Sequence, residues 1–207
     1  MKTEVSPLFI VFEGIDGSGK STQLARLSDR LTAAGIPHSC HREPTDGPVG
    51  RLLRRALSKE IDLDELTLAL LFAADRSEHA LLVQAELAAG RTVLCDRHLL
   101  SSLAYNAPDL DGQWVHSINA PIRSRVRPDI TFLFDLPVDE ALTRVSSRGE
   151  GRDHYEKREV LQQVRDRYLY WADQLADPIL RLDASRPIDS QTESLIQYLK
   201  DQHHMPL

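Results

Sequence analysis

A glycine-rich junction between two apolar segments constrains the fold of this chain more than any other feature. Residues 8–14, LFIVFEG, form a short apolar run of the kind found in strands buried on both faces of a sheet. Residues 14–19 contain three glycines, and leucines then recur at three- and four-residue spacing from Leu24 to Leu31, which predicts a helix that ends at Gly35. A buried strand that passes directly into a helix is typical of parallel α/β sheets.

The rest of the sequence repeats this alternation. Strand-like apolar segments follow at 36–41, 92–96, 129–136 and 178–184. Helical patterns cover about 63–89, 139–148, 156–175 and 188–200, whereas the prolines and glycines of 42–50 predict a loop. We therefore predict an α/β fold with three layers, in which a five-stranded parallel sheet is flanked by helices. No shift in composition divides the chain, so we expect one domain over 1–207.

The glycine-rich junction also matches the pattern G-x-x-x-x-G-K-[ST] between a predicted strand and a predicted helix. Successive backbone N–H groups of such a loop face one point, and the following helix N-terminus makes that point attractive to phosphate. Lys20 can reach the outer phosphates, and the Ser21 hydroxyl can hold Mg²⁺. A glycine-rich turn without a ligand is the alternative, but the four fixed positions match by chance in only about one chain in a hundred. The residues expected around the nucleoside triphosphate are Gly14, Ile15, Asp16, Gly17, Ser18, Gly19, Lys20, Ser21 and Thr22.

Composition excludes several classes of protein. The net charge of −6 argues against a nucleic-acid partner. No apolar run is long enough to cross a bilayer, so we expect no membrane partner, and the first residues lack the features of a secretory signal. Two cysteines, Cys40 and Cys95, suit a reducing compartment. We expect a cytoplasmic protein in which both are free, buried thiols, with a disulfide as the less favoured alternative.

Three segments indicate a second anionic ligand. The Asn-Lys-x-Asp signature of GTPases is absent, and the strand-like segment 92–96 does not end in the paired acids of motor ATPases. Instead Asp96, which could order Mg²⁺, precedes Arg97, which suits a second phosphate group. Arg42 falls at a strand end, where ligands of open α/β sheets gather. Phe72 and Arg76 share one helix face and could stack on a base and bind a phosphate. Taken alone, Phe72 is also typical of a core residue and Arg76 of a surface ion pair.

With these features in place, the chain resembles the thymidylate kinases, which phosphorylate dTMP to dTDP with MgATP. The resemblance covers nearly the whole chain, and the blocks that carry it are, in order, FEGIDGSGKSTQ, REPTDGPVGRLLR, LLFAADRSEH, VLCDRHLLSSLAYN, RPDITFLFDLPVDEALTRVSSRG and YEKREVLQQVRDRY. It implies a P-loop kinase fold with a short arginine-bearing lid at about 144–156.

The resemblance also implies roles for individual residues around the acceptor. It implies that Arg42 and Arg97 bind the acceptor phosphate, and that Arg76 contacts the base or the phosphate. Phe72 would stack on thymine, and Ser102 occupies the place of a polar contact to the base.

Three further residues have implied roles nearby. Tyr105 would lie under the deoxyribose and disfavour a 2′-hydroxyl. Asp16 and Asp96 would lie near the acceptor phosphate and Mg²⁺. The expected metal ligands are therefore Ser21 and Asp96. The expected catalytic residues outside the lid are Lys20, Asp16 and Arg97.

The lid is expected to supply a catalytic arginine, because the glycine-rich loop contains none. Arg144, Arg148 and Arg152 recur four apart, and a basic lid that closes over phosphates suits phosphoryl transfer. Arg148 and Arg152 are the catalytic candidates, and Arg144 is expected near the adenine. A solvated arginine face is the alternative. Asp183 and Ala184 resemble the family's adenine-side loop.

Two other functions stay open on the sequence alone. One is a kinase of similar architecture with a different pyrimidine acceptor, and the other is a switch that holds ATP and changes shape for a partner. The resemblance also suggests a homodimer. The apolar stretch 66–82 permits one, although a buried core helix explains this stretch equally well.

Overall fold

The computed structural model describes residues 6–105, 110–146 and 154–207. Its centre is a five-stranded sheet with the order β2-β3-β1-β4-β5, in which every neighbouring pair is parallel. The predicted five-stranded parallel sheet is therefore confirmed. The strands are β1 (Phe9–Glu13), β2 (His38–Arg42), β3 (Thr92–Asp96), β4 (Ile130–Asp135) and β5 (Ile179–Asp183).

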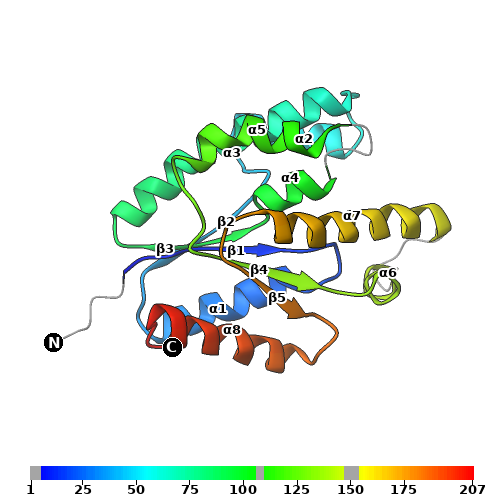
Figure 1. The fold of residues 1–207 in the computed structure, drawn as a ribbon. Coiled ribbons are helices and arrows are strands. Elements are labelled where there is room, and N and C mark those ends of the chain that lie inside the picture. Colours follow the sequence, from blue (N-terminus) through cyan, green and yellow to red (C-terminus); the bar gives the residue numbers. More distant parts are fainter. Residues whose placement is uncertain (1–5, 106–109, 147–153) are drawn as a thin grey trace.

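Helices cover both faces of this sheet and give the predicted three layers (Figure 1). Helices α1 and α8 pack together on one face, and α3, α4, α5 and α7 lie on the other. The helices are α1 (Lys20–Ala33), α2 (Pro48–Leu57), α3 (Glu65–Ala88), α4 (Leu99–Tyr105), α5 (Gly112–Arg123), α6 (Val138–Ser146), α7 (His154–Gln174) and α8 (Ile188–His203).

The side chains of β1 alternate between two apolar clusters, as the pleat of a strand requires. Ile10 and Phe12 belong to the larger cluster, which includes Leu27 of α1. Phe9 and Val11 belong to a second cluster, which includes Val83 of α3. All four β1 side chains are fully buried, so β1 is the centre of the molecule and the loop that follows it is held firmly.

Helices α2, α4 and α5 were not predicted. The prediction of a loop over 42–50 is wrong for its last residues, because Pro48 begins α2, where its missing N–H costs nothing. Helix α4 is a single short segment of seven residues, and α5 contains Pro121. Short helices and internal prolines weaken the periodic signal from which helices are predicted.

Both cysteines are free, as predicted, but their environments differ. Cys95 of β3 is fully buried, and this burial raises the pKa of its thiol well above the ordinary value. Cys40 is exposed, so the expectation that it is buried was wrong: β2 is the edge strand, and one of its faces reaches solvent. Among the described residues, the helices are all too short or too polar to cross a membrane.

Candidate active site

The loop between β1 and α1 is shaped by glycines at positions where a side chain would not fit. Gly14 has a φ of +144°, and a Cβ atom there would lie 2.6 Å from the carbonyl oxygen of Phe134. A Cβ atom at Gly17, where φ is +83°, would lie 2.8 Å from the carbonyl oxygen of Ala141 in α6. Glycine alone permits this path. The loop ends at the N-terminus of α1, where free N–H groups and the helix dipole attract anions.

Lys20 is the first residue of α1, and its side chain folds back against the loop. The side chain is only 7% exposed, with Nζ donating to the carbonyl oxygen of Ile15 at 3.3 Å and lying 3.7 Å from Asp16 Oδ1. Burial, followed by repulsion from Arg97, lowers the pKa of Lys20 despite the attraction of Asp16. The ammonium makes one long hydrogen bond and one long ion pair, so it retains donors for a phosphate.

Ser21 and Asp96, the predicted metal ligands, lie together beside this loop. Ser21 Oγ donates to Asp96 Oδ2 at 2.5 Å. Within the described part of the chain, the other carboxylate oxygen of Asp96 is buried without a hydrogen-bond partner. Buried carboxylate oxygens normally find a donor or a cation, and hydroxyl and carboxylate oxygens are ligands that Mg²⁺ prefers. These residues therefore fit a magnesium ion.

A cavity of about 460 Å³ adjoins the loop, a size typical of small-molecule sites. Its walls come from the ends of β1, β2 and β3 and from helices α2, α3 and α4. Asp16 of the loop lines it, so the loop and the cavity share a boundary. The predicted acceptor residues that line this cavity, called here the acceptor pocket, are Phe72, Arg76, Arg97, Ser102 and Tyr105.

Arg42 does not line the acceptor pocket. It lines a neighbouring, more open hollow of about 690 Å³ together with Ser21 and Asp96. Its side chain is 63% exposed, and its Nη2 atom lies 3.5 Å from Asp46 Oδ1. Arg42 thus borders the predicted metal site rather than the other acceptor residues.

Arg97 is held in the acceptor pocket by several partners. Its backbone has a φ of +72°, a conformation that residues other than glycine seldom adopt. Nη2 donates to Asp16 Oδ1 at 2.6 Å, and Nη1 donates to Ser101 Oγ at 3.2 Å and to the Tyr168 hydroxyl at 3.3 Å. The guanidinium also lies 5.1 Å from the ring centroid of Tyr105. A cation is thus fixed at the border between the loop and the pocket.

Arg76 is almost fully buried at the back of the same pocket. Nε donates to Glu43 Oε2 at 2.9 Å, and Nη1 donates to Asn119 Oδ1 at 2.7 Å. Nη2 donates to Ser102 Oγ at 2.8 Å and to the carbonyl oxygen of His98 at 3.1 Å. Because Glu43 already neutralises its charge, Arg76 is suited to a neutral polar group more than to a phosphate.

A second group of predicted residues meets on the opposite side of the loop. Arg144 of α6 donates to the carbonyl oxygen of Ala184 at 3.1 Å and to that of Gly17 at 3.4 Å. Asp183 accepts a hydrogen bond from the backbone N–H of Ser185 and shapes the turn after β5. Arg144 and Ala184 are therefore brought to the loop, whereas Asp183 faces its own turn.

Part of the predicted lid cannot be placed. Arg148 and Arg152 lie outside the described residues, and their assignment as catalytic residues stays a prediction. Thr22 is described and is exposed in the first turn of α1.

Several residues of the site were missed in the sequence. Glu13 is fully buried and accepts from the backbone N–H groups of His98 at 2.7 Å and Ser101 at 3.0 Å. Tyr168 donates to the same carboxylate at 3.1 Å, and burial raises the pKa of this phenol well above its ordinary value. Glu13 could have been found in the sequence, because it is the one charged residue in the apolar run 8–14 and a buried charge indicates a functional role. Tyr168 offered no such signal, because an aromatic residue on a helix face also suits a core.

Known proteins resemble this chain over nearly its whole length. Residues 12–195 match the family model described as thymidylate kinase. A probable thymidylate kinase of Methanocaldococcus jannaschii is 39% identical over 201 residues, which cover 97% of this chain and 100% of that protein. A thymidylate kinase of Exiguobacterium sibiricum is 39% identical over 208 residues, covering 95% and 98%. One of Magnetococcus marinus is 38% identical over 187 residues, covering 87% and 89%. The chain therefore belongs to the thymidylate kinase family.

Proposed function

We propose that this chain is a kinase that transfers the γ-phosphoryl group of ATP to the phosphate of dTMP and so forms dTDP. One observation carries the proposal: the glycine-rich phosphate loop and a nucleotide-sized pocket meet at Asp16, which belongs to both. Phosphoryl transfer depends on positioning and charge neutralisation, and it needs two phosphate sites that adjoin.

Family membership and the pocket support different roles for Arg97 and Arg76, one binding the phosphate of the acceptor and the other its base. Arg97, at the border with the loop, binds the acceptor phosphate: its partner Asp16 is 67% exposed, so water screens this ion pair, whereas the Arg76–Glu43 pair is buried. Arg76, whose charge is balanced by Glu43, contacts the base through its remaining N–H. Phe72 stacks on thymine, and Ser102 borders the base.

Three further residues complete the acceptor side. Tyr105 lies under the deoxyribose, where its ring leaves little room for a 2′-hydroxyl. Asp16 keeps Arg97 oriented through their short ion pair. Arg42, from the neighbouring hollow, approaches the acceptor phosphate from the metal side.

On the donor side, the loop from Gly14 to Gly19 binds the phosphates through backbone N–H groups, and Lys20 neutralises charge on the transferred group. Ser21 and Asp96 hold Mg²⁺, which supplies positive charge to the phosphates when bound. Arg144, Ala184 and Asp183 border the adenine. Residues 1–207 form one kinase domain, and Arg148 and Arg152 belong to a lid at about 144–156 that closes over the phosphates.

The proposal is tested by measuring ADP release with a panel of acceptors: dTMP, dUMP, CMP, UMP and AMP. We expect kcat/KM to be highest with dTMP. Turnover with CMP, UMP or AMP well above that with dTMP would refute the acceptor assignment and favour a kinase for another nucleotide.

A second experiment separates a kinase from an ATP-dependent switch, because a switch has no need of a second phosphate site. Arg97→Ala should abolish dTMP phosphorylation while ATP binding, measured by calorimetry, stays within about twofold. Arg30→Ala, on the exposed end of α1, is the matched control and should leave both unchanged. Equal loss of ATP binding and turnover in Arg97→Ala would favour the switch.

Two properties of the whole molecule belong to the same proposal. We place the protein in the cytoplasm, where the exposed Cys40 thiol stays reduced. We also propose a homodimer formed through α3, whose exposed leucines include Leu66, Leu70 and Leu81.

A further inference from the structure

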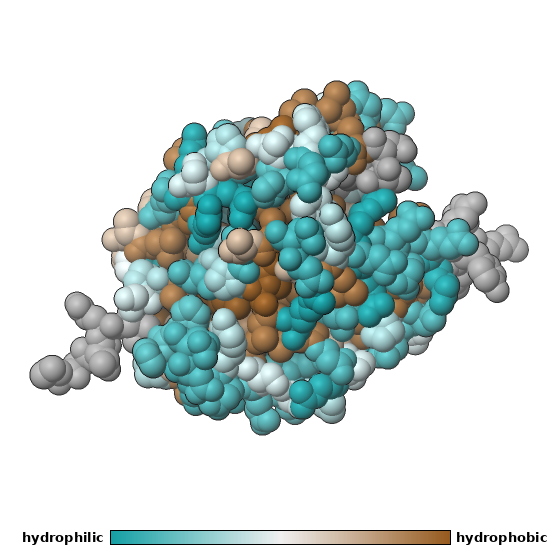
Figure 2. Space-filling model, viewed as in Figure 1, coloured by the Kyte–Doolittle hydropathy of each residue, from teal (hydrophilic) through white to brown (hydrophobic). Residues whose placement is uncertain are grey.

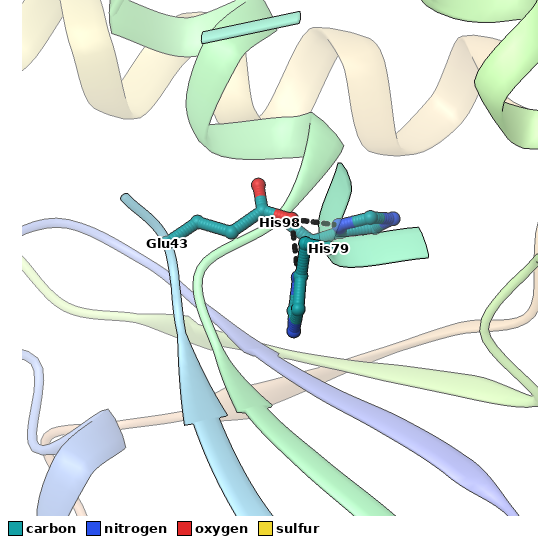
Figure 3. Close-up of side chains that lie close together, drawn as sticks. All are labelled: Glu43, His79 and His98. Carbon is teal, nitrogen blue, oxygen red and sulfur yellow. Dashed lines mark hydrogen bonds and ion pairs between the residues drawn. The ribbon is translucent and has the colours of Figure 1, made fainter. Parts of the chain in front are cut away.

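In the wall of the acceptor pocket, one carboxylate and two imidazoles form a buried cluster, Glu43, His79 and His98 (Figure 3). Glu43 and His98 are themselves lining residues of the pocket. Their side chains are 3%, 1% and 5% exposed. Glu43 follows β2, His79 belongs to α3, and His98 precedes α4, so the cluster ties together three elements that surround the pocket. Both imidazoles reach the same atom: Nδ1 of His79 and Nδ1 of His98 each lie 2.9 Å from Glu43 Oε1.

The chemistry of the carboxylate assigns the protons of this cluster. An ionised carboxylate can only accept hydrogen bonds, so both imidazoles must donate from Nδ1. The pKa of Glu43 supports the ionised form: burial alone would raise it, but Arg76 and the two histidines hold it well below its ordinary value. Oε1 therefore receives two imidazole N–H groups, while Oε2 receives Arg76.

A divalent cation is the other ligand that such a cluster suggests, because its three potential ligand atoms lie within 4.8 Å of one another. Two features oppose it. The Arg76 guanidinium already lies 2.8 Å from Glu43 Oε2 and would repel a dication nearby. A metal would also need the lone pairs of both Nδ1 atoms, which would end the two donations to Oε1.

Arg76 joins the cluster to the part of the pocket beside Phe72 and Ser102. Glu43 holds Nε and Nη2 of Arg76, and the same Nη2 donates to Ser102 Oγ at 2.8 Å. Arg76 and Ser102 line the pocket beside Phe72. The direction in which Arg76 presents its N–H groups to a ligand thus depends on the orientation of the Glu43 carboxylate.

We propose that His79 and His98 are positioning residues for acceptor recognition: their Nδ1–H groups lock the Glu43 carboxylate, which in turn orients Arg76 toward the base of the acceptor. This inference rests on the proposed dTMP kinase function. Without one of the two donors, Oε1 loses a hydrogen bond and the carboxylate can rotate. Arg76 then keeps its Nη contacts to Asn119, Ser102 and the His98 carbonyl but loses a fixed partner for Nε, so its alignment toward the base loosens. Glu43 Oε2 bonds to Arg76, not to Lys20, Ser21 or Asp96, so we expect the main effect on the acceptor, although His79 also lines the hollow that contains Ser21 and Asp96.

The proposal is tested by replacing His79 or His98 with residues that place an N–H donor at the Nδ1 position, at the Nε2 position or nowhere. The amide nitrogen of asparagine takes the place of imidazole Nδ1, whereas that of glutamine reaches toward Nε2. His79→Leu and His79→Gln should raise the KM for dTMP about tenfold, the scale of one buried hydrogen bond, with the KM for ATP changed less than about twofold. His79→Asn should return the KM for dTMP to within about threefold of wild type. The same series at His98 should behave alike.

His116→Leu is the matched control, because His116 is also a hydrogen-bonded imidazole stacked on an aromatic ring but lies outside the cluster. It should leave both KM values unchanged. If the leucine variants fail to fold, as judged by thermal melting, the proposal is tested by comparing the KM for dTMP of the asparagine and glutamine variants.

Three outcomes would overturn the inference: an unchanged KM for dTMP in folded leucine and glutamine variants, equal increases in both KM values, or no difference between asparagine and glutamine. Stoichiometric zinc in purified wild-type protein that disappears in His79→Leu would overturn it as well. Wild-type protein that fails to phosphorylate dTMP refutes the proposed function itself, whereas active wild type with unaffected variants refutes only this inference.

Discussion

At the scale of single residues, the ion pair between Glu43 and Arg76 carries a clear dependence on pH. Both side chains are buried, and burial alone would raise the pKa of Glu43, but Arg76 together with His98 and His79 holds it well below its ordinary value of 4.5. A carboxyl group with a depressed folded-state pKa stabilises the fold at pH values above its unfolded pKa, and this contribution is lost as the pH falls toward the folded-state pKa.

Glu43→Gln should therefore be less stable than wild type by about 3–5 kcal/mol at pH 7, because Arg76 is left buried without a counter-ion. The difference should shrink as the pH falls below 4.5, the ordinary value for this carboxyl group. Urea unfolding of both proteins between pH 3 and pH 7 measures it. A difference that is constant over this range, or that grows in acid, would contradict the assignment.

Lys20 provides a second prediction at this scale. Because its ammonium is buried against the loop and has donors to spare, Lys20→Ala should lower kcat about 10²–10³-fold. Its melting temperature should stay near that of wild type, because the lost ion pair with Asp16 is long. Lys200→Ala, at an exposed position in α8, is the control for removing a lysine. A large fall in the melting temperature of Lys20→Ala would show that this lysine is structural.

These residues also show how far sequence reasoning reaches. The pattern around Lys20 and Ser21 is local, so the spacing alone located both side chains correctly beside the loop. Arg76 was expected to contact the base or the phosphate, but its partners Glu43 and Asn119 are distant in the chain. Only the folded structure reveals that its charge is already neutralised. The buried cluster of Glu43 with two histidines could not be read from the sequence for the same reason.

At the scale of elements, the loop between β1 and α1 can be tested with two glycines that differ in what surrounds them. Gly14 and Gly35 both have positive φ, but a Cβ atom at Gly14 would meet the backbone of Phe134, whereas one at Gly35 would meet nothing within 4 Å. Gly35→Ala should lose about 1–2 kcal/mol of stability from the left-handed conformation alone and keep the KM for ATP. Gly14→Ala should displace the loop and lower kcat/KM for ATP about 10²-fold.

Kinetics and urea unfolding of the two variants provide the measurement. Comparable ATP kinetics in Gly14→Ala and Gly35→Ala would mean that the loop tolerates displacement, and that its close approach to β4 is not needed for nucleotide binding.

The elements themselves were predicted unevenly, and the reason is physical. The three central strands, β1, β3 and β4, were found because each is a short apolar run buried on both faces of the sheet. The edge strands β2 and β5 were also found, although they are only partly buried. Helix α2 was missed although its apolar positions are strongly periodic, because Gly47, Pro48 and Gly50 at its start also indicate a loop. Helix α4 was missed because seven residues are too few to show a helical period.

At the scale of the whole molecule, the surface of α3 is the basis of the proposed homodimer. Apolar residues gather over the helices at the top of Figure 2, which are the α2, α3 and α5 layer of Figure 1. In α3, Leu66, Leu70 and Leu81 are 47%, 47% and 57% exposed in a single chain. At about 100° per residue, these three positions fall within about 60° of one another around the helix axis. An apolar stripe of this kind is costly in water and suits pairing with its symmetry mate.

We therefore predict that the protein has twice the mass of one chain in light scattering, and that Leu70→Glu converts it to a monomer. A two-fold interface places the two introduced carboxylates near each other, so repulsion adds to the lost apolar contact. Val160→Glu, at a similarly exposed apolar position on α7, adds the same charge away from the stripe and should stay dimeric. The melting temperature of wild type should rise with protein concentration, and that of Leu70→Glu should not. A monomeric wild type, or a Leu70→Glu variant that remains dimeric, would exclude this face as the interface.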